Sequence, residues 1–324
     1  MSDDGAALGA RLREQDLSAA PAALNLLEST APADREQAAA LLREVSPVAL
    51  GSEAPAHVIG VTGPPGAGKS TLLSALLHAW RGTAREVGSE GRTVAMLAVD
   101  PSSRRSGGSL LGDRARIEFD PADRGVLIRS TAAGERLGGL AQATRSAAEA
   151  LAAAFDIVVI ETVGVGQAET DVADVADTVV VVVQPGSGDV LQFLKSGIME
   201  IPDVLVVTKA DLGQIATRAR RDLAAALRSL GSSQARVVAV SALSPPSGID
   251  ELVAALDDHR AGLDVVARRL AARRAAALTD FAVEHGERGL KALGGRRAAL
   301  ALLAEQDRGM DVPALVAALE RQLA

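Results

Sequence analysis

Cysteine, histidine and aromatic residues are missing or scarce in this 324-residue chain, and each shortage excludes a kind of chemistry. Because cysteine is absent, the chain has no disulfides, no thiolate nucleophile and no cysteine-rich zinc site. Histidine occurs only four times, at scattered positions, and we therefore expect no histidine-based metal cluster. Aromatic residues make up 2% of the chain, which is too few for the base-stacking surfaces that single-stranded nucleic acid needs.

An excess of positive charge and long hydrophobic runs are also missing. Aspartate and glutamate number 41 against 34 lysines and arginines, and the net charge of −7 argues against a protein that wraps nucleic-acid phosphates. We interpret the arginine-rich segment 268–274 as a solvated helix face or a dimer-contact helix. No apolar run approaches the ~20 residues that span a bilayer, and the acidic N-terminus is unlike a secretory signal. We therefore expect a cytoplasmic protein with no nucleic-acid or membrane partner.

Hydrophobic residues make up 48% of the chain, and their spacing divides the sequence into three regions. Residues 1–54 and 263–324 have the Ala, Leu and Arg spacing of helices, and we expect an N-terminal helical region and a C-terminal helical arm. Residues 55–262 instead alternate β-branched runs with helical segments, which predicts an α/β domain with a mainly parallel sheet and helices on both faces. The runs are HVIGVTG, TVAMLAVD, VLIRS, FDIVVIET, TVVVVVQP, DVLVVTK and RVVAVS.

The first β-branched run leads directly into a glycine-rich loop and then into a helical segment. This loop fits the pattern G-x-x-x-x-G-K-S/T of a P-loop, whose backbone N–H groups converge on phosphates. Lys69 is expected to reach the outer phosphates and the Ser70 hydroxyl to bind Mg²⁺. The sequence therefore predicts a P-loop NTPase. The predicted phosphate-binding residues are Gly63, Pro64, Pro65, Gly66, Ala67, Gly68, Lys69, Ser70 and Thr71.

A second motif, Thr208-Lys209-Ala210-Asp211, follows the buried run DVLVV. An Asp in this place accepts two hydrogen bonds from the guanine edge, whereas adenine would leave the carboxylate unpaired at a cost of about 1–3 kcal/mol. The motif therefore predicts a guanine nucleotide, with the Lys209 stem over the ring. Thr208 replaces the usual Asn, and we expect its shorter hydroxyl to weaken the bonding within the loop. The base pocket is completed by Ser241, Ala242 and Leu243.

Acidic residues at the ends of two other strands are candidates for magnesium binding. Glu161 ends FDIVVI and Asp100 ends TVAMLAVD, so both face the edge of the sheet that carries the phosphate loop. Asp113, in the glycine-rich segment GGSLLGDR, would approach when that loop closes. Gly164 leaves its N–H free to meet a γ-phosphate, and Gln167 is a candidate for orienting the attacking water. The predicted magnesium ligands are Ser70, Asp100, Asp113 and Glu161.

Nine segments occur in the order GPPGAGKST, LAVDPSS, GGSLLGDR, LGG, ETVGVGQAE, PGSGD, LQFLKSGI, TKAD and SAL. This series resembles the MeaB/ArgK family of GTPases, which are chaperones of adenosylcobalamin-dependent acyl-CoA mutases such as methylmalonyl-CoA mutase. The resemblance covers roughly residues 8–262 and includes a Glu, Glu161, in the switch II motif. It implies a GTPase that binds GTP or GDP with Mg²⁺, forms a homodimer through its C-terminal arm, and has a mutase as its partner.

The resemblance also implies roles for individual residues. Asp100, Asp113 and Glu161 would organise Mg²⁺ and the γ-phosphate, and Lys195 would lie in a third loop that responds to nucleotide and partner. The lysine count agrees with this, because only four of the 34 basic residues are lysines and three of them fall on motif positions, at 69, 195 and 209. The predicted catalytic residues are Lys69, Asp100, Asp113, Glu161 and Lys195.

A mechanism and three alternatives follow from these motifs. The γ-phosphate of bound GTP would order the loops around 101–116, 162–170 and 186–197, hydrolysis would release them, and turnover would be slow until a partner completes the site. The first alternative is a metal-insertion GTPase, which needs the Cys or His clusters that this sequence lacks. The second is an ATP-dependent kinase or transport-accessory ATPase on the same loop. The third is a structural dimer module that the nucleotide only stabilises.

Overall fold

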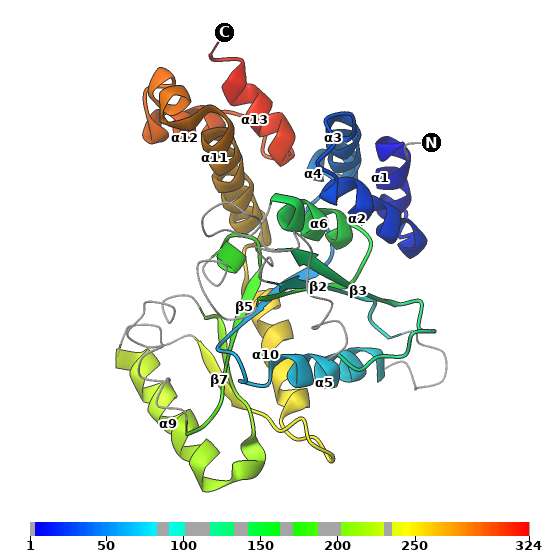
Figure 1. Cartoon of the computed structure of the whole chain (residues 1–324). Helices are drawn as coiled ribbons and strands as arrows, with labels where there is room; N and C mark the ends of the chain where they lie inside the picture. The colour runs from blue at the N-terminus through cyan, green and yellow to red at the C-terminus, as the bar shows by residue number, and fades with distance from the viewer. Residues whose placement is uncertain are drawn as a thin grey trace, which may run out of the picture. The chain divides into compact units, whose positions relative to one another are not determined.

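The computed structural model describes residues 4–82, 91–100, 117–132, 142–162, 171–186, 202–229 and 235–323. The chain divides into two compact units, whose helices and strands are drawn in Figure 1. The first comprises Met1–Ala56, Gln142–Ala154 and Asp264–Ala324, and the second comprises His57–Ala141 and Phe155–Leu263. The three-part division expected from the sequence remains a prediction, and the structure adds that Gln142–Ala154 groups with the terminal segments. Among the described helices, none is long and apolar enough to cross a membrane.

All seven β-branched runs form strands of one parallel sheet in the second unit, and this confirms the predicted fold class. The strands lie in the order β3-β2-β4-β1-β5-β6-β7. β1 is therefore central, between β4 and β5, and the loop that follows it leaves the middle of the carboxyl edge. The strands are β1 His57–Thr62, β2 Val94–Asp100, β3 Val126–Ala132, β4 Ile157–Thr162, β5 Thr178–Val183, β6 Val204–Val207 and β7 Arg236–Ala239.

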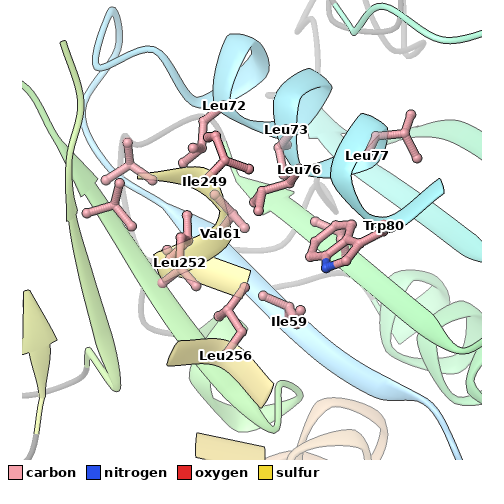
Figure 2. Packing of buried hydrophobic residues seen from close by; sticks show 14 of the residues in the cluster. Ile59, Val61, Leu72, Leu73, Leu76, Leu77, Trp80, Ile249, Leu252 and Leu256 are labelled. Atoms are coloured by element: carbon pink, nitrogen blue, oxygen red, sulfur yellow. The ribbon is translucent and has the colours of Figure 1, made fainter. Parts of the chain in front are cut away.

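One face of the sheet is covered by the two helices α5 and α10. Figure 2 shows Leu73 of α5 and Leu252 of α10 meeting Ile59 and Val61 of β1 in one hydrophobic cluster. Trp80 of α5 is only 2% exposed in this cluster, so it is a core residue. Each large apolar side chain buried in this way stabilises the fold by roughly 1.5–3 kcal/mol. The helical elements of this unit are α5 Lys69–Gly82, η4 Val172–Asp174, η6 Ala210–Leu212, α9 Gln214–Ser229 and α10 Ile249–Gly262.

The opposite face of the sheet is covered as well. Val58 and Gly60 alternate along β1 with the residues that face α5, so they point to the other side of the sheet. A Cβ atom on Gly60 would lie 2.6 Å from a methyl group of Val172 and 3.1 Å from the Cβ of Ala176. Glycine therefore allows η4 to lie directly against the central strand. All six residues of β1 are buried, as expected for a parallel strand covered on both sides.

A chain of polar side chains lies at the amino end of β1. His57 Nε2 lies 2.7 Å from Thr178 Oγ1, which lies 2.8 Å from His259 Nδ1. The His259 Nε2 atom in turn lies 3.3 Å from a carboxylate oxygen of Asp203. Burial is the largest influence on His57 and lowers its pKa to about 4. His57 is therefore neutral at physiological pH and forms its hydrogen bond in that state.

The terminal segments are helical, as predicted, and they form one unit with α6. α1, α2 and α3 contact one another and α6, while α11 contacts α12 and α13 around a buried cluster that includes Phe281. The helices of the C-terminal segment are separated at Gly294-Gly295 and around Gly309. The helical elements are α1 Gly5–Arg13, η1 Leu17–Ala19, α2 Ala20–Glu28, α3 Asp34–Glu44, α4 Pro47–Leu50, α6 Gln142–Ala152, α11 Val265–Ala292, α12 Arg296–Ala304 and α13 Val312–Glu320.

Two arginines of α11 correct the expectation that segment 268–274 is a solvated face. Arg273 is 8% exposed, and its guanidinium donates two hydrogen bonds, of 2.9 and 2.7 Å, to the carboxylate of Glu53. Arg269 donates to the carbonyl oxygens of Ala54 and Ala56 at 2.6 and 2.7 Å. A buried guanidinium needs such partners, because an unpaired buried charge is strongly destabilising. These bonds hold α11 to residues 53–56 within the first unit.

Candidate active site

The predicted phosphate loop connects β1 to α5 at the centre of the sheet. Gly63 has a φ of 144°, and a Cβ atom on it would lie 2.1 Å from the carbonyl oxygen of Val182 on β5. Gly66 and Gly68 also have positive φ angles, of 77° and 91°. Glycine is thus required where the loop passes β5 and where it turns into α5. The N-terminus of α5 has partial positive charge and N–H groups without partners in the helix, which suits phosphate oxygens.

Lys69 is the first residue of α5, and its side chain returns over the loop. The Nζ atom donates hydrogen bonds to the carbonyl oxygens of Gly63 at 2.7 Å and Pro64 at 3.3 Å. The side chain is buried, with 7% of the residue exposed. The ammonium group is therefore held inside the loop, where it would neutralise the charge of a bound polyphosphate.

The rest of the predicted loop differs in exposure. Ala67 is fully buried, and its N–H donates to the carbonyl oxygen of Pro64 at 3.2 Å, which closes a tight turn. Pro65 and Gly66 are exposed at the tip of the loop. Thr71 is exposed in the first turn of α5. The buried residues thus fix the shape of the loop, and the exposed ones form its outer wall.

Ser70 and Glu161 lie together beside the phosphate loop. The Ser70 Oγ atom donates to the Glu161 carboxylate across 3.4 Å, although the two residues are 91 positions apart in the sequence. Glu161 belongs to β4, which pairs directly with β1, and is 6% exposed. A hydroxyl and a carboxylate are hard oxygen donors of the kind that Mg²⁺ prefers. The chemistry of this donor pair therefore fits a magnesium ion next to the phosphates.

Of four further predicted residues, the structure describes only Asp100, and of Asp100 only the backbone. Asp100 ends β2, where its backbone pairs in register with Ala132 of β3, and β2 also adjoins β4. Its backbone therefore lies at the same edge of the sheet as Glu161, while its side chain lies outside the described part of the chain. Asp113, Gly164 and Lys195 also lie outside the described residues. The same holds for Gln167, for the loops at 101–116 and 187–197, and for 163–170.

Thr208 joins the second motif to the phosphate loop. Its hydroxyl lies 2.7 Å from the carbonyl oxygen of Ala67 and 3.1 Å from that of Val183, and it donates to these two acceptors. The Thr208 N–H also donates to Val183 at 2.9 Å, and the residue is 5% exposed. The hydroxyl in place of Asn therefore still ties the two loops together. The expected weakening of the bonding within the loop, relative to Asn, remains a prediction.

Two side chains of the second motif, those of Lys209 and Asp211, lie at the surface. Lys209 adopts the left-handed backbone conformation, with φ 55° and ψ 44°, and its ammonium group donates to the side-chain oxygen of Gln184. The Ser241 hydroxyl donates to an exposed carboxylate oxygen of Asp211 at 2.9 Å. The backbone supports the same arrangement, since the Ala210 N–H donates to the carbonyl oxygen of Val240 at 3.0 Å. Strands β6 and β7 thus bring both predicted base-binding segments to one place.

The remaining part of the predicted base pocket follows β7. Ser241 and Ser247 exchange backbone hydrogen bonds of 3.0 and 2.9 Å, which closes the loop between them. Ala242 is half-buried, whereas Leu243 is 62% exposed. Gln184 is a contact that the sequence motifs did not predict. The available signal was its position as the first polar residue after β5, a strand adjacent to both β1 and β6.

Comparisons with known proteins identify the family to which this chain belongs. Residues 5–289 match the family described as "Methylmalonyl Co-A mutase-associated GTPase MeaB". GTPase ArgK of Escherichia coli is 37% identical over 266 residues, which are 80% of this chain and 76% of that protein. The mouse "Methylmalonic aciduria type A homolog, mitochondrial" is 40% identical over 211 residues, which are 61% of this chain and 48% of that protein.

A solved structure gives the same result for the fold. A crystal structure described as a "LAO/AO transport system kinase" is similar to this chain, with a TM-score of 0.65 and 28% sequence identity. The similarity covers 99% of this chain and 98% of the chain in that crystal structure. The predictions of a P-loop fold, of GTPase activity and of the family are therefore confirmed. This chain belongs to the MeaB family of GTPases, which are named for their association with methylmalonyl-CoA mutase.

Proposed function

We propose that this protein is a Mg²⁺-dependent GTPase chaperone that couples its nucleotide state to cofactor loading or protection of an adenosylcobalamin-dependent acyl-CoA mutase. Two findings support the partner class: the name of the matching family and the name of the mouse relative. The nucleotide assignment is supported mainly by the hydrogen bonds of the Thr208 hydroxyl to Ala67 and Val183. These bonds join the phosphate loop to the motif Thr208–Asp211, which we call the guanine motif, at one edge of the sheet. A homodimer and a cytoplasmic location belong to the same proposal, and neither is needed for nucleotide binding.

In the proposed complex, one nucleotide lies along the carboxyl edge of the sheet. The backbone of Gly63–Gly68 and the N-terminus of α5 bind the phosphates, and Lys69 turns to the β- and γ-phosphate oxygens. The carboxylate of Asp211 accepts two hydrogen bonds from guanine, and the Lys209 stem covers the ring. Ser241, Ala242 and Leu243 line the base, with the Ser241 hydroxyl holding the Asp211 carboxylate in position.

The same proposal gives each polar group at the phosphates a function. Ser70 and Glu161 would hold Mg²⁺, with Asp100, Asp113 and the N–H of Gly164 completing the site around the γ-phosphate. When bound, the ion supplies positive charge to the β- and γ-phosphate oxygens. Water attacks the γ-phosphorus, the bond from that phosphorus to the bridging oxygen breaks, and GDP and phosphate leave. Lys69 stabilises the charge that accumulates on the phosphate oxygens during this step.

Coupling to the mutase follows from a difference in affinity. A mutase that binds the GTP form more tightly than the GDP form changes the nucleotide equilibrium, and the nucleotide changes mutase binding by the same factor. Lys195 would contribute to this coupling of nucleotide and mutase binding through its loop. The mutase, rather than this protein, would carry the cobalamin. A slow intrinsic turnover that a mutase accelerates is therefore the expected behaviour.

The test is phosphate release with GTP and with ATP, each in the presence and absence of a purified adenosylcobalamin-dependent acyl-CoA mutase. We expect hydrolysis of GTP that depends on Mg²⁺, with ATP at least about 30-fold poorer because it leaves Asp211 unpaired. We also expect the mutase to raise the rate. Equal hydrolysis of ATP would contradict the guanine assignment, and a rate unchanged by saturating mutase would contradict the partner assignment.

A second candidate function is an ATP-dependent kinase of a transport system. The name of the similar crystal structure favours it, and the phosphate loop alone does not distinguish the two activities. The exposed Asp211 argues against it, because a carboxylate in this place matches guanine and not adenine. Transfer of radioactive phosphate from ATP to a protein acceptor would support the kinase, whereas release of free phosphate from GTP alone supports the GTPase.

A further inference from the structure

The last strand of the sheet, β7, pairs with β6 alone among the residues that the structure describes. α9 lies beside it (Figure 1). Between the two elements is a hollow of about 330 Å³. A strand at the edge of a sheet presents backbone N–H and C=O groups to any extended chain, and proteins usually protect such edges. The hollow therefore lies where a further extended segment has access to the sheet.

The lining of this hollow has two chemically distinct parts. The small and apolar side chains of Ala224, Leu227, Ala235 and Val237 form its floor, and Leu227 is 1% exposed. The rim is cationic and consists of Arg220, Arg221 and Arg228 of α9. The floor can bury apolar side chains, and the rim can bind anionic groups at the same time. We call this surface the arginine groove.

The three arginines of the groove rim differ from their neighbours in one respect. Arg218 on the same helix pairs with Asp222, and Arg236 on β7 pairs with Asp258. Within the described ranges, no carboxylate of this chain lies within ion-pair distance of the three rim guanidiniums. The protein as a whole has a net charge of −7, so this local excess of positive charge runs against its average composition. The groove is thus complementary to an anionic occupant.

The shape of the surface favours one kind of anionic occupant. The groove lies between α9 and the edge strand β7, which contributes Val237 to it, and in an extended chain the side chains alternate between two sides with a period of two residues. A segment that alternates acidic and apolar residues would direct carboxylates to the rim and apolar side chains to the floor, while its backbone pairs with β7. Guanidinium and carboxylate groups also match in geometry, because two parallel hydrogen bonds join them.

We propose that the arginine groove is a docking site for an acidic, extended segment of a partner protein, which adds to the sheet beside β7. This goes beyond the proposed function, because it names a surface away from the nucleotide and does not depend on which protein the partner is. The two elements that form the groove are close in sequence to the predicted base-binding residues. α9 begins two residues after η6, which contains Asp211, and β7 leads into Ser241. An occupant here would therefore also affect guanine binding.

The test uses a fluorescein-labelled heptapeptide of alternating glutamate and valine, titrated with the full-length protein at low salt and followed by fluorescence anisotropy. We expect saturable binding that weakens as salt screens the charges. A variant with Arg220→Gln, Arg221→Gln and Arg228→Gln should bind about tenfold more weakly, since each exposed ion pair adds a few-fold in affinity. Arg218→Gln is the matched control on the same helix and should stay within about twofold of the wild type.

Two further measurements distinguish strand addition from attraction by charge or shape alone. A peptide of alternating glutamine and valine has the same shape without the charge and should not bind at the same concentrations. Hydrogen exchange of the β7 amides should slow when the acidic peptide is bound, because new backbone hydrogen bonds form at the edge. GTP hydrolysis without peptide should be the same in the triple variant and the wild type, which shows that the variant is folded.

Several results would overturn the proposal. The first is no binding of the acidic peptide by the wild type. The second is binding that the triple variant retains in full or that Arg218→Gln loses equally. The third is displacement of the peptide by inorganic pyrophosphate without any change in the hydrogen exchange of the β7 amides. That result would indicate a simple anion-binding site and not strand addition. None of these results bears on the GTPase assignment, because hydrolysis is measured separately.

Discussion

The phosphate end and the base end of the candidate active site are constructed in different ways. At the phosphate end, Lys69 is 7% exposed and Glu161 is 6% exposed. Lys69 belongs to α5, which packs on the core of the sheet, and Glu161 belongs to β4, which pairs with the central strand β1. At the base end, Lys209 and Asp211 are exposed; Lys209 donates a hydrogen bond to Gln184, and Asp211 accepts one from Ser241. The phosphate end is therefore fixed by the fold itself. Changes there should affect catalysis and stability, whereas changes at the base end should affect selectivity.

The largest effect is expected from Lys69→Ala at the phosphate end. The variant loses the ammonium group that the loop holds at the phosphates, and GTP hydrolysis should fall by about 100- to 1,000-fold. Phosphate release under saturating GTP measures this loss. Lys291→Ala removes an exposed lysine of α11 and is the matched control, with turnover within about twofold of the wild type. Equal losses in both variants would disprove the assigned function of Lys69.

Gly63→Ala tests whether the fold itself fixes the phosphate end. A methyl group would meet the Val182 carbonyl at 2.1 Å in a backbone conformation with φ of 144°, so the protein should lose about 3 kcal/mol of unfolding free energy. Urea unfolding gives this value. Gly66→Ala is the control: its φ is also positive, but open space surrounds it, and the cost should be about 1 kcal/mol. A Gly63 variant as stable as the wild type would show that the loop is not fixed by β5.

Asp211→Asn tests the base end. The amide donates one hydrogen bond where the carboxylate accepts two, so affinity for GDP should fall by about 30-fold, or about 2 kcal/mol. The same change should improve binding of a xanthine nucleotide, which presents an oxygen where guanine presents an amino group. Calorimetry with GDP and with the xanthine nucleotide measures the two affinities. Stability should be unaffected because Asp211 is exposed. Asp250→Asn, at an exposed site in α10, should leave both affinities unchanged.

Acid should destabilise the sheet from its amino end without altering base selectivity. Folding lowers the pKa of His57 from its ordinary value of 6.5 to about 4, so the unfolded chain binds the proton more readily. Stability should therefore fall as the pH drops below 6.5, by about 2 kcal/mol at pH 5. Urea unfolding at pH 7 and 5 measures this difference. His57→Gln should remove most of it, and His78→Asn, on the exposed face of α5, should leave it unchanged.

The change of stability with pH must be compared between the wild type and the two histidine variants, because other groups act on stability in the opposite direction. Burial is the main reason that the pKa of Glu149 rises to about 7, so its ionisation opposes folding as the pH increases. The difference between the wild type and His57→Gln cancels this contribution. A slope that His57→Gln leaves intact would assign the acid sensitivity to carboxylates instead of His57.

The smallest effect is expected from Thr208→Val, which tests the connection between the two ends. Valine has the shape of threonine but cannot donate to the carbonyl oxygen of Ala67, so we expect a loss of about 1 kcal/mol in nucleotide affinity. Stopped-flow release of a fluorescent GDP measures it as roughly a fivefold faster dissociation. Thr217→Val in α9 removes a similar hydroxyl bond, to the carbonyl oxygen of Gly213, and should have no effect on release. An unchanged rate for Thr208→Val would mean that the two loops act independently.

The sequence predicted the parts of the fold that depend on local pattern. All seven apolar runs became strands, and helices such as α5 and α9 lie between them, as the alternating pattern predicted. The order of the strands was not predicted, because it depends on which strands the crossover helices allow to pair. The grouping of α6 with the terminal helices was likewise not indicated, because it rests on contacts between residues far apart in the chain.

For the candidate active site, motif spacing predicted where polar groups meet but not how they are bonded. The closeness of Ser70 and Glu161 agrees with their prediction as shared magnesium ligands, although the pairing of β1 with β4 that produces it was not predicted. The bond between Lys209 and Gln184 was not expected, because neither residue type requires the other. The burial of Arg273 also escaped prediction, since its partner Glu53 lies 220 positions away and helical periodicity carries no information about it.

The position of Trp80 gives this protein a built-in optical reporter. Tyrosine is absent and there is no second tryptophan, so near-ultraviolet emission comes from one indole at the far end of the helix that begins with Lys69. The ring is 2% exposed, and opening of this core would shift its emission to longer wavelengths. Because the chain also has no native thiol, one introduced cysteine can carry a dye without competition, and energy transfer from Trp80 can then follow that site during turnover.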